Sequence, residues 1–356
     1  MPNVAVVIAA AATGSRAVTA VTTPDLLVDA TTRQVAPRDL ARVASGPLFS
    51  RMTATEFDVR CDDPRVGAAL QAWLVALRLE VPQRVVFEVT VADASLPALT
   101  DTVFEQPEVR FARGPGGRGI RLAWEVAPAV ADVPAEATTA SVWLSLGAVD
   151  RLEHCTRTFL MAVLVVLLRR AGWHHLHAAT AIDPTGRGGL VAGNAHAGKS
   201  TTAALLAAWG WRVGTDDVAF LDRRGQRVVV HAARARIALR EGGRRLLARA
   251  GGVALPARGK VGYWPEDLGG IWTPLVEPDV VIFTSVGNAR TSAKLVEPPA
   301  AMAELVRWSA WVMLEPDLAQ GHLELITRLA RQARCYRVTL GRDLFTRPQR
   351  LLELVA

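Results

Sequence analysis

Apolar and polar positions along the first part of the chain predict short strands, turns and one helix. The segments VAVVI at 4–8 and RVVFEVTVA at 84–92 are rich in β-branched residues, which favours strands. The glycine-rich turn at 114–119 separates two strand-like segments, so we expect a β-hairpin there. One segment, 64–79, has apolar residues at helical spacing, at Val66, Leu70, Leu74 and Leu77.

The pattern changes near residue 150. Pro128 to Ala140 is the most linker-like segment, and residues 150–171 form a predicted helix that is apolar nearly all round and therefore buried. Beyond it, predicted strands and helices alternate, which is typical of an α/β sheet covered on both faces. We expect a smaller α/β accessory domain over residues 1–150 and a second α/β domain over residues 151–356. The predicted strands cover 175–183, 190–192, 218–222, 227–231, 279–283 and 335–340, and the predicted helices 201–209, 300–314 and 321–333.

A phosphate-binding motif lies between one of these strands and the next helix. The sequence GNAHAGKS at 193–200 fits G-x-x-x-x-G-K-[ST]. The two glycines let backbone N–H groups curl around an anion, and the helix that follows adds its positive dipole end. Lys199 is expected to reach the β- and γ-phosphates, and the Ser200 hydroxyl to bind Mg²⁺. The predicted nucleotide-binding residues are Gly193, Asn194, Ala195, His196, Ala197, Gly198, Lys199, Ser200 and Thr201.

Lysine is rare in this chain, which makes each lysine informative. Only Lys199, Lys260 and Lys294 are lysines among 41 basic residues. Arginine is the default cation here, so a lysine indicates a place where a compact ammonium is needed. The glycine-containing loop at 256–270 carries Lys260, and we predict that this lysine binds phosphate when the loop closes. Arg258, Tyr263 and Trp264 lie in the same loop, and whether its aromatic residues line a pocket or pack in the core stays open.

Two adjacent carboxylates, Asp216 and Asp217, follow the predicted P-loop helix. One carboxylate can bind or orient the metal while the other accepts a proton from an attacking hydroxyl, and we assign these roles to Asp216 and Asp217 in that order. The alternative is a turn-forming pair. The other suitable strand, 279–283, has Asp279 before its apolar run, which would place that carboxylate at the wrong end of the sheet.

Three histidines, His174, His175 and His177, precede the P-loop strand. No acidic or cysteine ligand accompanies them locally, so a metal site is not favoured. His177 lies in the strand that leads toward the P-loop, and we expect it near the γ-phosphate. The alternative for each histidine is an ordinary residue with a satisfied hydrogen bond.

Taken together, LHAATAID, GNAHAGKSTTAALLAAWGW and RVGTDD resemble the HPr kinase/phosphorylase superfamily, over about residues 151–356. The resemblance implies a P-loop kinase domain related in fold to phosphoenolpyruvate carboxykinase, which uses ATP and Mg²⁺ to phosphorylate a serine hydroxyl. It also implies Lys199 and Ser200 as phosphate and Mg²⁺ residues, His177 as the active-site histidine and Asp217 as the catalytic base, beside Asp216.

The sequence departs from that family in two respects. Thr201 stands where bacterial HPr kinases usually have Glu, and the downstream signature of their phosphorylase reaction is not found. Similarity to kinases that act on precursor peptides in lasso-peptide biosynthesis is therefore also implied. The acceptor is then a serine of a peptide or protein. A small hydroxylated metabolite as acceptor, and an ATPase switch or scaffold, are the alternatives.

Charge and composition narrow the possible partners. The net charge of +7 comes from scattered arginines without a basic block, so nucleic-acid binding is not favoured. The longest apolar run, Phe159 to Leu168, is shorter than the ~20 residues that span a bilayer. Three separated cysteines without ligand spacing fit a reducing cytoplasm. Whether the chain forms a homo-oligomer is left open.

Overall fold

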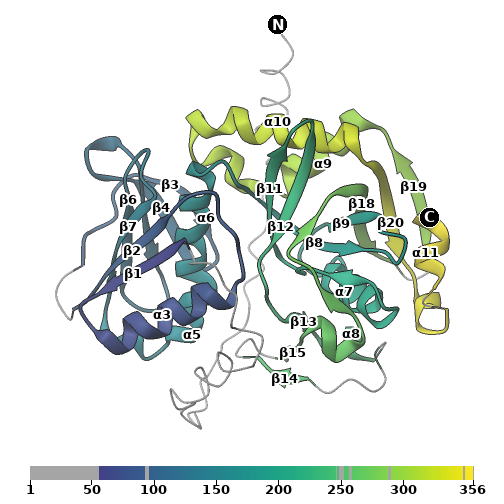
Figure 1. Ribbon diagram of the computed structural model, residues 1–356, viewed down its shortest axis with the longest axis horizontal. Helices are drawn as coiled ribbons and strands as arrows, with labels where there is room; N and C mark the ends of the chain where they lie inside the picture. Colours follow the sequence, from purple (N-terminus) through teal and green to yellow (C-terminus); the bar gives the residue numbers. More distant parts are fainter. Residues whose placement is uncertain are drawn as a thin grey trace, which may run out of the picture. The chain divides into compact units, whose positions relative to one another are not determined.

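The computed structural model describes residues 56–92, 96–245, 247, 252–255, 259–287, 290–347 and 349–355. The predicted strand at 4–8, and Arg258 in the predicted lid, lie outside the described residues. The described chain is a mixed α/β structure with several sheets, as predicted (Figure 1). No helix in the described ranges combines the length and apolarity that crossing a membrane requires.

A seven-stranded sheet follows the order β1-β2-β7-β6-β5-β4-β3. β1, β2 and β7 pair in parallel, and the remaining strands pair antiparallel. Helix α3 (Pro64–Ala76) connects β1 to β2 and buries Val66, Leu70 and Leu74, as its apolar spacing predicted. The strands are β1 (Phe57–Cys61), β2 (Val85–Val91), β3 (Thr102–Gln106), β4 (Val109–Arg113), β5 (Ile120–Trp124), β6 (Ala129–Val133) and β7 (Thr139–Leu144).

The linker prediction for Pro128–Ala140 is wrong. This segment contains β6 and enters β7, which pair with each other inside the sheet. Ala129, Ala131 and Val133 enter the apolar core of this sheet at alternate positions, and Val130 between them is buried outside it, so the segment follows the period of a strand. Its small side chains and its prolines hid that period.

The segment after β7 is helical and packs into the core of the same sheet. It consists of α4 (Leu146–Val149), α5 (Leu152–Cys155), a π-helical turn η3 (Thr156–Leu160) and α6 (Met161–Arg170). All but the two end residues of α6 are buried, as its apolar composition predicted. These helices share one apolar core with α3 and the seven strands. The division at residue 150 stays a prediction.

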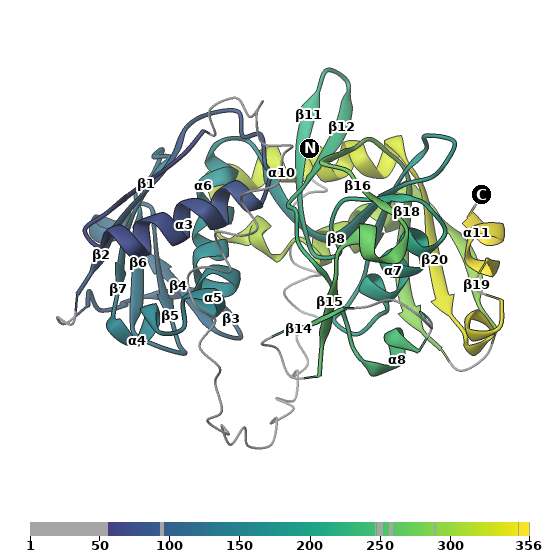
Figure 2. The same cartoon turned by 60° about the horizontal axis from the view of Figure 1, so that its bottom comes forward.

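A second sheet, of ten strands, carries the predicted P-loop (Figure 2). Its main order is β17-β12-β11-β8-β9-β18-β20-β19, and β10 pairs with both β8 and β16. β9, β18 and β20 are parallel, whereas β8 runs antiparallel to both β9 and β11. The strands are β8 (His174–Ile182), β9 (Gly188–Ala192), β10 (Arg212–Val213), β11 (Val218–Arg224), β12 (Arg227–Ala232), β16 (Ile271–Trp272), β17 (Leu275–Val276), β18 (Pro278–Val286), β19 (Ser292–Val296) and β20 (Arg334–Leu340).

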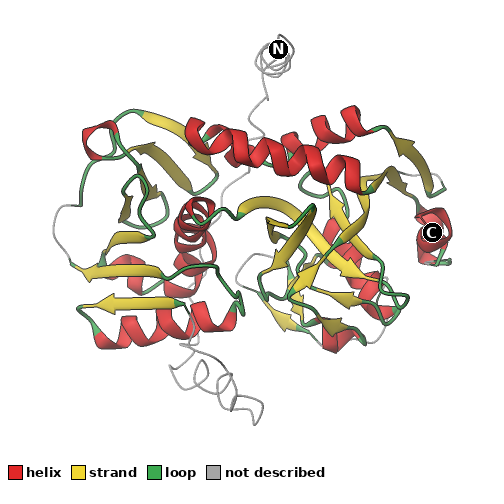
Figure 3. Ribbon diagram, turned by 45° about the horizontal axis from the view of Figure 1, so that its top comes forward, coloured by secondary structure: helices red, strands yellow, loops and turns green. Residues whose placement is uncertain are grey.

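Helices cover both faces of the ten-stranded sheet (Figure 1, Figure 3). On one face α9 (Pro298–Arg307) and α10 (Pro316–Gln332) pack on residues such as Val281 and Phe283. On the other face α7 (Lys199–Ala208) and α11 (Arg350–Val355) pack on residues such as Val280 and Ile282. Alternate residues of one strand thus enter opposite cores, which is the two-sided burial expected of an α/β sheet.

The remaining short elements complete this part of the chain. A three-stranded sheet is formed by β13 (Ile237–Leu239), β15 (Val261–Tyr263) and β14 (Val253–Ala254). The short helices are η2 (Pro115–Gly117), α8 (Glu241–Arg244), η4 (Pro265–Leu268), η5 (Ala310–Met313) and η6 (Arg342–Phe345).

Two of the three neighbouring histidines are buried and belong to a polar cluster in the core. The rings of His174 and His322 stack with centroids 4.7 Å apart, and Arg169 is buried close by. Burial, with the charge of Arg169, lowers the pKa of His174 to about 4. Burial and neighbouring cationic groups lower the pKa of His175 to about 3 and that of His322 to about 2.

We expect stability to fall as the pH drops from 7 toward 4.5. Histidine in the unfolded chain has a pKa of about 6.5. Over this pH range His174, His175 and His322 therefore become protonated in the unfolded chain but stay neutral in the folded protein, which favours unfolding. Each such histidine lowers the unfolding free energy by about 1.4 kcal/mol per pH unit at most. Asp216 has the opposite effect on stability, because its pKa is raised to about 6 in the folded protein, which therefore binds this proton at a higher pH than the unfolded chain does.

Denaturant unfolding at several pH values checks this expectation. His322→Phe, which keeps an aromatic ring against His174, should reduce the pH slope by about one proton. His196→Asn is the control, because His196 is exposed. An unchanged slope in His322→Phe would contradict a role of this buried ring in the pH dependence.

Candidate functional site

The loop between β9 and α7 has the backbone of an anion-binding turn. Gly198 has φ +96°, a backbone conformation that favours glycine and strains any other residue. His196 also has a positive φ, of 66°. No side chain caps the N-terminus of α7, which leaves its first-turn N–H groups directed at the loop. This geometry suits a phosphate at the helix N-terminus.

Lys199 lies across the mouth of this loop. The side chain is buried, and its Nζ donates hydrogen bonds to the carbonyl oxygens of Gly193 (2.8 Å) and Asn194 (3.0 Å). Burial lowers the pKa of the ammonium, while the carboxylates of Asp216 and Asp217 oppose that shift. The Lys199 ammonium is held by two carbonyl oxygens of the loop. It is therefore placed to donate hydrogen bonds to phosphate oxygens in their stead.

The two aspartates lie in a turn that Thr215 holds. Thr215 Oγ1 accepts hydrogen bonds from the N–H groups of Asp217 (3.3 Å) and Val218 (3.1 Å). The Thr215 N–H in turn donates to Thr180 Oγ1 of β8 at 3.2 Å. This hydrogen bonding fixes both carboxylates at the start of β11, beside β8.

Asp216 points inward, toward the P-loop helix. Its side chain is buried, accepts a hydrogen bond from Ser200 and accepts another from the Ala238 N–H at 3.1 Å. Burial, followed by the charge of Asp217, raises the pKa of Asp216 to about 6, although both hydrogen bonds oppose the rise. A carboxylate and a hydroxyl in contact beside a phosphate loop form an oxygen donor pair suited to Mg²⁺.

Asp217 points the other way. Its side chain is 56% exposed and pairs with Nδ1 of His177. The strand register explains this contact, because Val218 lies opposite His177 in the β8–β11 pair. Partial removal of water by the surrounding protein raises the pKa of Asp217. The hydrogen bond and charge of His177, with smaller contributions from His175 and Lys199, outweigh this and lower the pKa to about 2.

The site residues predicted from the sequence converge on one cleft of 980 Å³. Eleven of them line it: His177, Asn194, Ala195, His196, Gly198, Lys199, Ser200, Thr201, Asp216, Asp217 and Lys260. Gly193 and Ala197 belong to the same loop without lining the cleft. Of the loop aromatics, Trp264 lines the cleft, whereas Tyr263 is buried in the core beside α7.

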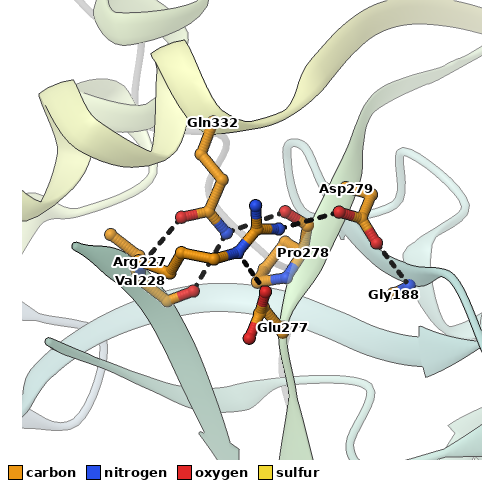
Figure 4. Close-up of polar contacts among 7 residues, drawn as sticks. All are labelled: Gly188, Arg227, Val228, Glu277, Pro278, Asp279 and Gln332. Carbon is orange, nitrogen blue, oxygen red and sulfur yellow. Dashed lines mark hydrogen bonds and ion pairs between the residues drawn. The ribbon is translucent and has the colours of Figure 1, made fainter. Parts of the chain in front are cut away.

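Asp279 lies near the start of β9, because the neighbouring Pro278 is paired with Gly188; Figure 4 shows its polar contacts there. It accepts hydrogen bonds from Arg227 (2.8 Å) and from the N–H of Gly188 (3.3 Å), the first residue of β9. Gln332 joins the same end of the sheet through the carbonyls of Val228 and Pro278. Because the P-loop follows the last residue of β9, Asp279 cannot serve it, as its place before the apolar run predicted.

The three histidines of β8 differ in burial. His177 reaches the cleft, while His174 and His175 are buried. Within the part of the chain that the structure describes, no group of three or more His, Cys, Asp or Glu side chains could hold a metal ion.

Sequence reasoning missed the other residues that line the cleft. Three guanidinium groups lie on its wall, those of Arg157, Arg234 and Arg236. The wall also includes Trp73 of α3, the helix that packs on the seven-stranded sheet. Arginine is so frequent in this chain that no single one is conspicuous. The alternation of Arg234 and Arg236 ahead of the loop that carries Trp264 was the available signal.

Comparisons with known proteins do not show a family for this chain. No protein-family model matches this chain, and no curated protein matches it. Among solved structures, it is similar to an HPr(Ser) kinase/phosphatase from Coxiella burnetii, with 12% sequence identity and a TM-score of 0.27. The match covers 51% of this chain and 88% of that one. Likeness at this TM-score carries no argument, so function is inferred from the cleft and its sequence motifs.

Replacing His177 with alanine should raise the pKa of Asp217 toward the ordinary value of about 3.9, since its main stabilising partner is lost. Carboxyl NMR shifts recorded against pH measure this. His154→Ala is a matched control, because the His154 side chain is also 39% exposed and pairs with a different carboxylate, Glu108. An unchanged Asp217 pKa in His177→Ala would show that the histidine does not set it.

Proposed function

We propose that this chain is an ATP- and Mg²⁺-dependent kinase that transfers the γ-phosphate to the hydroxyl of a serine in a peptide or protein. The observation that carries the proposal is the convergence of three groups on one cleft. These are the P-loop with Lys199, the contact between Ser200 and Asp216, and the exposed Asp217 carboxylate paired with His177. A P-loop supports nucleotide binding, and a second, accessible carboxylate supports activation of an acceptor.

The residues present fit Mg²⁺ with a nucleotide. The Ser200 hydroxyl and the Asp216 carboxylate are in contact, and oxygen ligands of this kind suit Mg²⁺, which commonly takes one or two protein ligands and completes its shell with phosphates and water. When bound there, Mg²⁺ would neutralise charge on the β- and γ-phosphates. Lys199 and the first-turn amides of α7 would hold the same phosphates.

Transfer then requires little from the protein beyond positioning and one proton acceptor. The serine oxygen forms a bond to the γ-phosphorus while the bond from that phosphorus to the bridging oxygen of ADP breaks. ADP leaves with the electron pair, and the serine proton passes to the Asp217 carboxylate. The low pKa of Asp217 keeps it ionised at neutral pH, and His177 fixes its orientation. Lys260, in the cleft wall, is proposed to bind phosphate.

The order of His177, the P-loop and the Asp pair further supports assignment to the HPr kinase-like superfamily, as a diverged member. Within that proposal, residues 151–356 are the kinase domain and residues 1–150 an accessory domain for substrate recognition. Incubation with Mg²⁺ and γ-labelled ATP tests the activity. Label on a serine peptide supports the proposal, label on a small hydroxylated metabolite supports a metabolite kinase, and label only in free phosphate supports an ATPase switch.

Lys199→Ala should abolish phosphoryl transfer and leave the fold intact. The ammonium neutralises phosphate charge, whereas the backbone of the loop depends on its glycines. Transfer rates and thermal unfolding measure the two effects. Lys294→Ala serves as the control, because that lysine is exposed on β19, away from the cleft. Wild-type transfer by Lys199→Ala would exclude the loop as the phosphate site.

The two aspartates should respond differently to the same substitution. Asp217→Asn should lower the transfer rate by about 10²- to 10⁴-fold, as expected for loss of a general base, with ATP still bound. Asp216→Asn should instead raise the Mg²⁺ concentration needed for half-maximal rate, because it removes a metal ligand in contact with Ser200. Rates measured across a Mg²⁺ titration separate the two. Small and equal effects would favour the turn-forming alternative.

A further inference from the structure

The cleft extends past the catalytic pair to a second wall, which we call the arginine wall: Trp73, Leu77, Arg157, Arg234, Arg236 and Trp264. Residues 233–238 connect this wall to the aspartates. The Ala233 N–H donates to the Val218 carbonyl (3.2 Å), and the Ala238 N–H to Asp216 Oδ2 (3.1 Å). Arg234 and Arg236 lie between these two anchors, so they border the place where an acceptor would approach Asp217.

The same segment is fixed to the seven-stranded sheet. The Arg234 N–H donates to the carbonyl of Leu77, just after α3, at 2.8 Å. Val218, next to Asp217, also packs against the core of that sheet. The arginine wall is therefore held by backbone contacts on both sides, independently of any ligand.

Stacking on tryptophan orients two of its guanidinium groups. Arg234 lies between Trp264 and Trp272, with centroid distances of 4.8 and 5.2 Å. Arg236 lies over Trp264 at 4.5 Å. A stacked guanidinium keeps its N–H edge available for a bidentate bond to a planar anion, and its orientation costs little further entropy on binding.

The arginines differ in what already occupies that edge. Arg234 donates to Glu266 at 3.1 Å. Arg236 approaches Asp267 only to 3.9 Å, and the same Asp267 oxygen accepts a hydrogen bond from the Trp264 N–H at 2.7 Å. Arg157 is exposed and has no carboxylate within 4.0 Å among the described residues. Arg236, with Arg157 beside the same cleft, is thus the donor that a ligand can engage.

The charge of the cleft exceeds what a nucleotide explains. Lys199, Arg240, Lys260 and Arg342 line the cleft outside the arginine wall, where the phosphates are proposed to bind. Glu153 is the carboxylate that lines the cleft besides Asp216 and Asp217, in the described part of the chain. A neutral acceptor would remove water from the guanidinium groups of the arginine wall without giving them a hydrogen-bond partner, and this desolvation costs free energy. A carboxylate on the acceptor would instead form charge-assisted hydrogen bonds with them.

We propose that the acceptor is a serine in an acidic segment, whose neighbouring Asp or Glu carboxylate is bound by Arg236. This inference rests on the proposed kinase function and specifies its substrate class. Trp73, which is partly exposed, provides an apolar surface for the stem of the acidic residue and the adjoining peptide. Arg234, already paired with Glu266, positions Trp264 rather than binding the substrate.

The proposal is tested with a set of serine peptides that each carry a single Glu. The Glu is placed in turn at each of the three positions before and the three positions after the serine, and each peptide has a matched version with Gln instead of Glu. In at least one register, the full-length protein should prefer Glu over Gln by about 10- to 100-fold in kcat/KM, mainly through KM, which is what a charge-assisted hydrogen bond provides. Arg236→Gln should remove the preference and Arg236→Lys should keep part of it. Arg236→Glu should favour the corresponding Lys peptide.

Arg245→Gln is the matched control, because Arg245 is exposed, pairs with Glu241 and does not line the cleft. Binding of the same peptides in the presence of Mg²⁺ and a non-hydrolysable ATP analogue gives a second readout. Equal binding and turnover of Glu and Gln peptides in every register, or no binding of either, overturns the proposal, as does a preference that survives in Arg236→Gln. Mg·ATP binding by the wild type, lost in Lys199→Ala, tests the kinase function separately.

Discussion

The position of β8 between β9 and β11 is the constraint on which the whole site depends. Ala178 lies opposite Ala192, the last residue of β9 before the P-loop, and His177 lies opposite Val218, the first residue of β11 after the aspartates. Two adjacent residues of one strand thus fix the loop that would hold phosphate and the carboxylates that would activate an acceptor. A one-residue slip of β8 would turn His177 away from Asp217, because alternate residues of a strand face opposite sides.

The same neighbours give the adjacent aspartates opposite properties. Asp216 is buried against the P-loop helix and Asp217 faces the cleft, so burial governs one pKa and His177 governs the other. Hydrogen bonds from backbone N–H groups to the Thr180 and Thr215 hydroxyls hold the turn in which the two aspartates lie. Two chemically identical groups can then divide metal binding and proton transfer between them, as proposed, because environment rather than residue type sets each role.

The sequence was informative wherever local chemistry decides the structure. The helix with Leu70 and Leu74 on one face, the hairpin around residues 114–119 and the strand–loop–helix at the P-loop follow from period and glycine placement alone. Prediction failed at 128–140, where alanines made a paired strand look like a linker. It did not find the arginine wall, because only tertiary packing brings Trp73 and Arg236 to the same cleft, and the spacing of Arg234 and Arg236 is a weak signal in an arginine-rich chain.

The arginine wall also connects the seven-stranded sheet to the proposed catalytic residues. Phe220 of β11, Ala233 and Trp311 are buried in the core of that sheet, and Trp311 packs edge-on against Phe111 of β4 with centroids 5.3 Å apart. β11, the strand that begins just after Asp217, therefore contributes to the core of its own ten-stranded sheet and to the core of the seven-stranded sheet, against which Trp73 of α3 packs. Close-packed cores transmit displacement with little slack. Substitutions in the core around Phe111 would accordingly shift the arginine wall relative to Asp217, so the proposed acceptor recognition and the proposed catalysis would be coupled through packing rather than through direct contact.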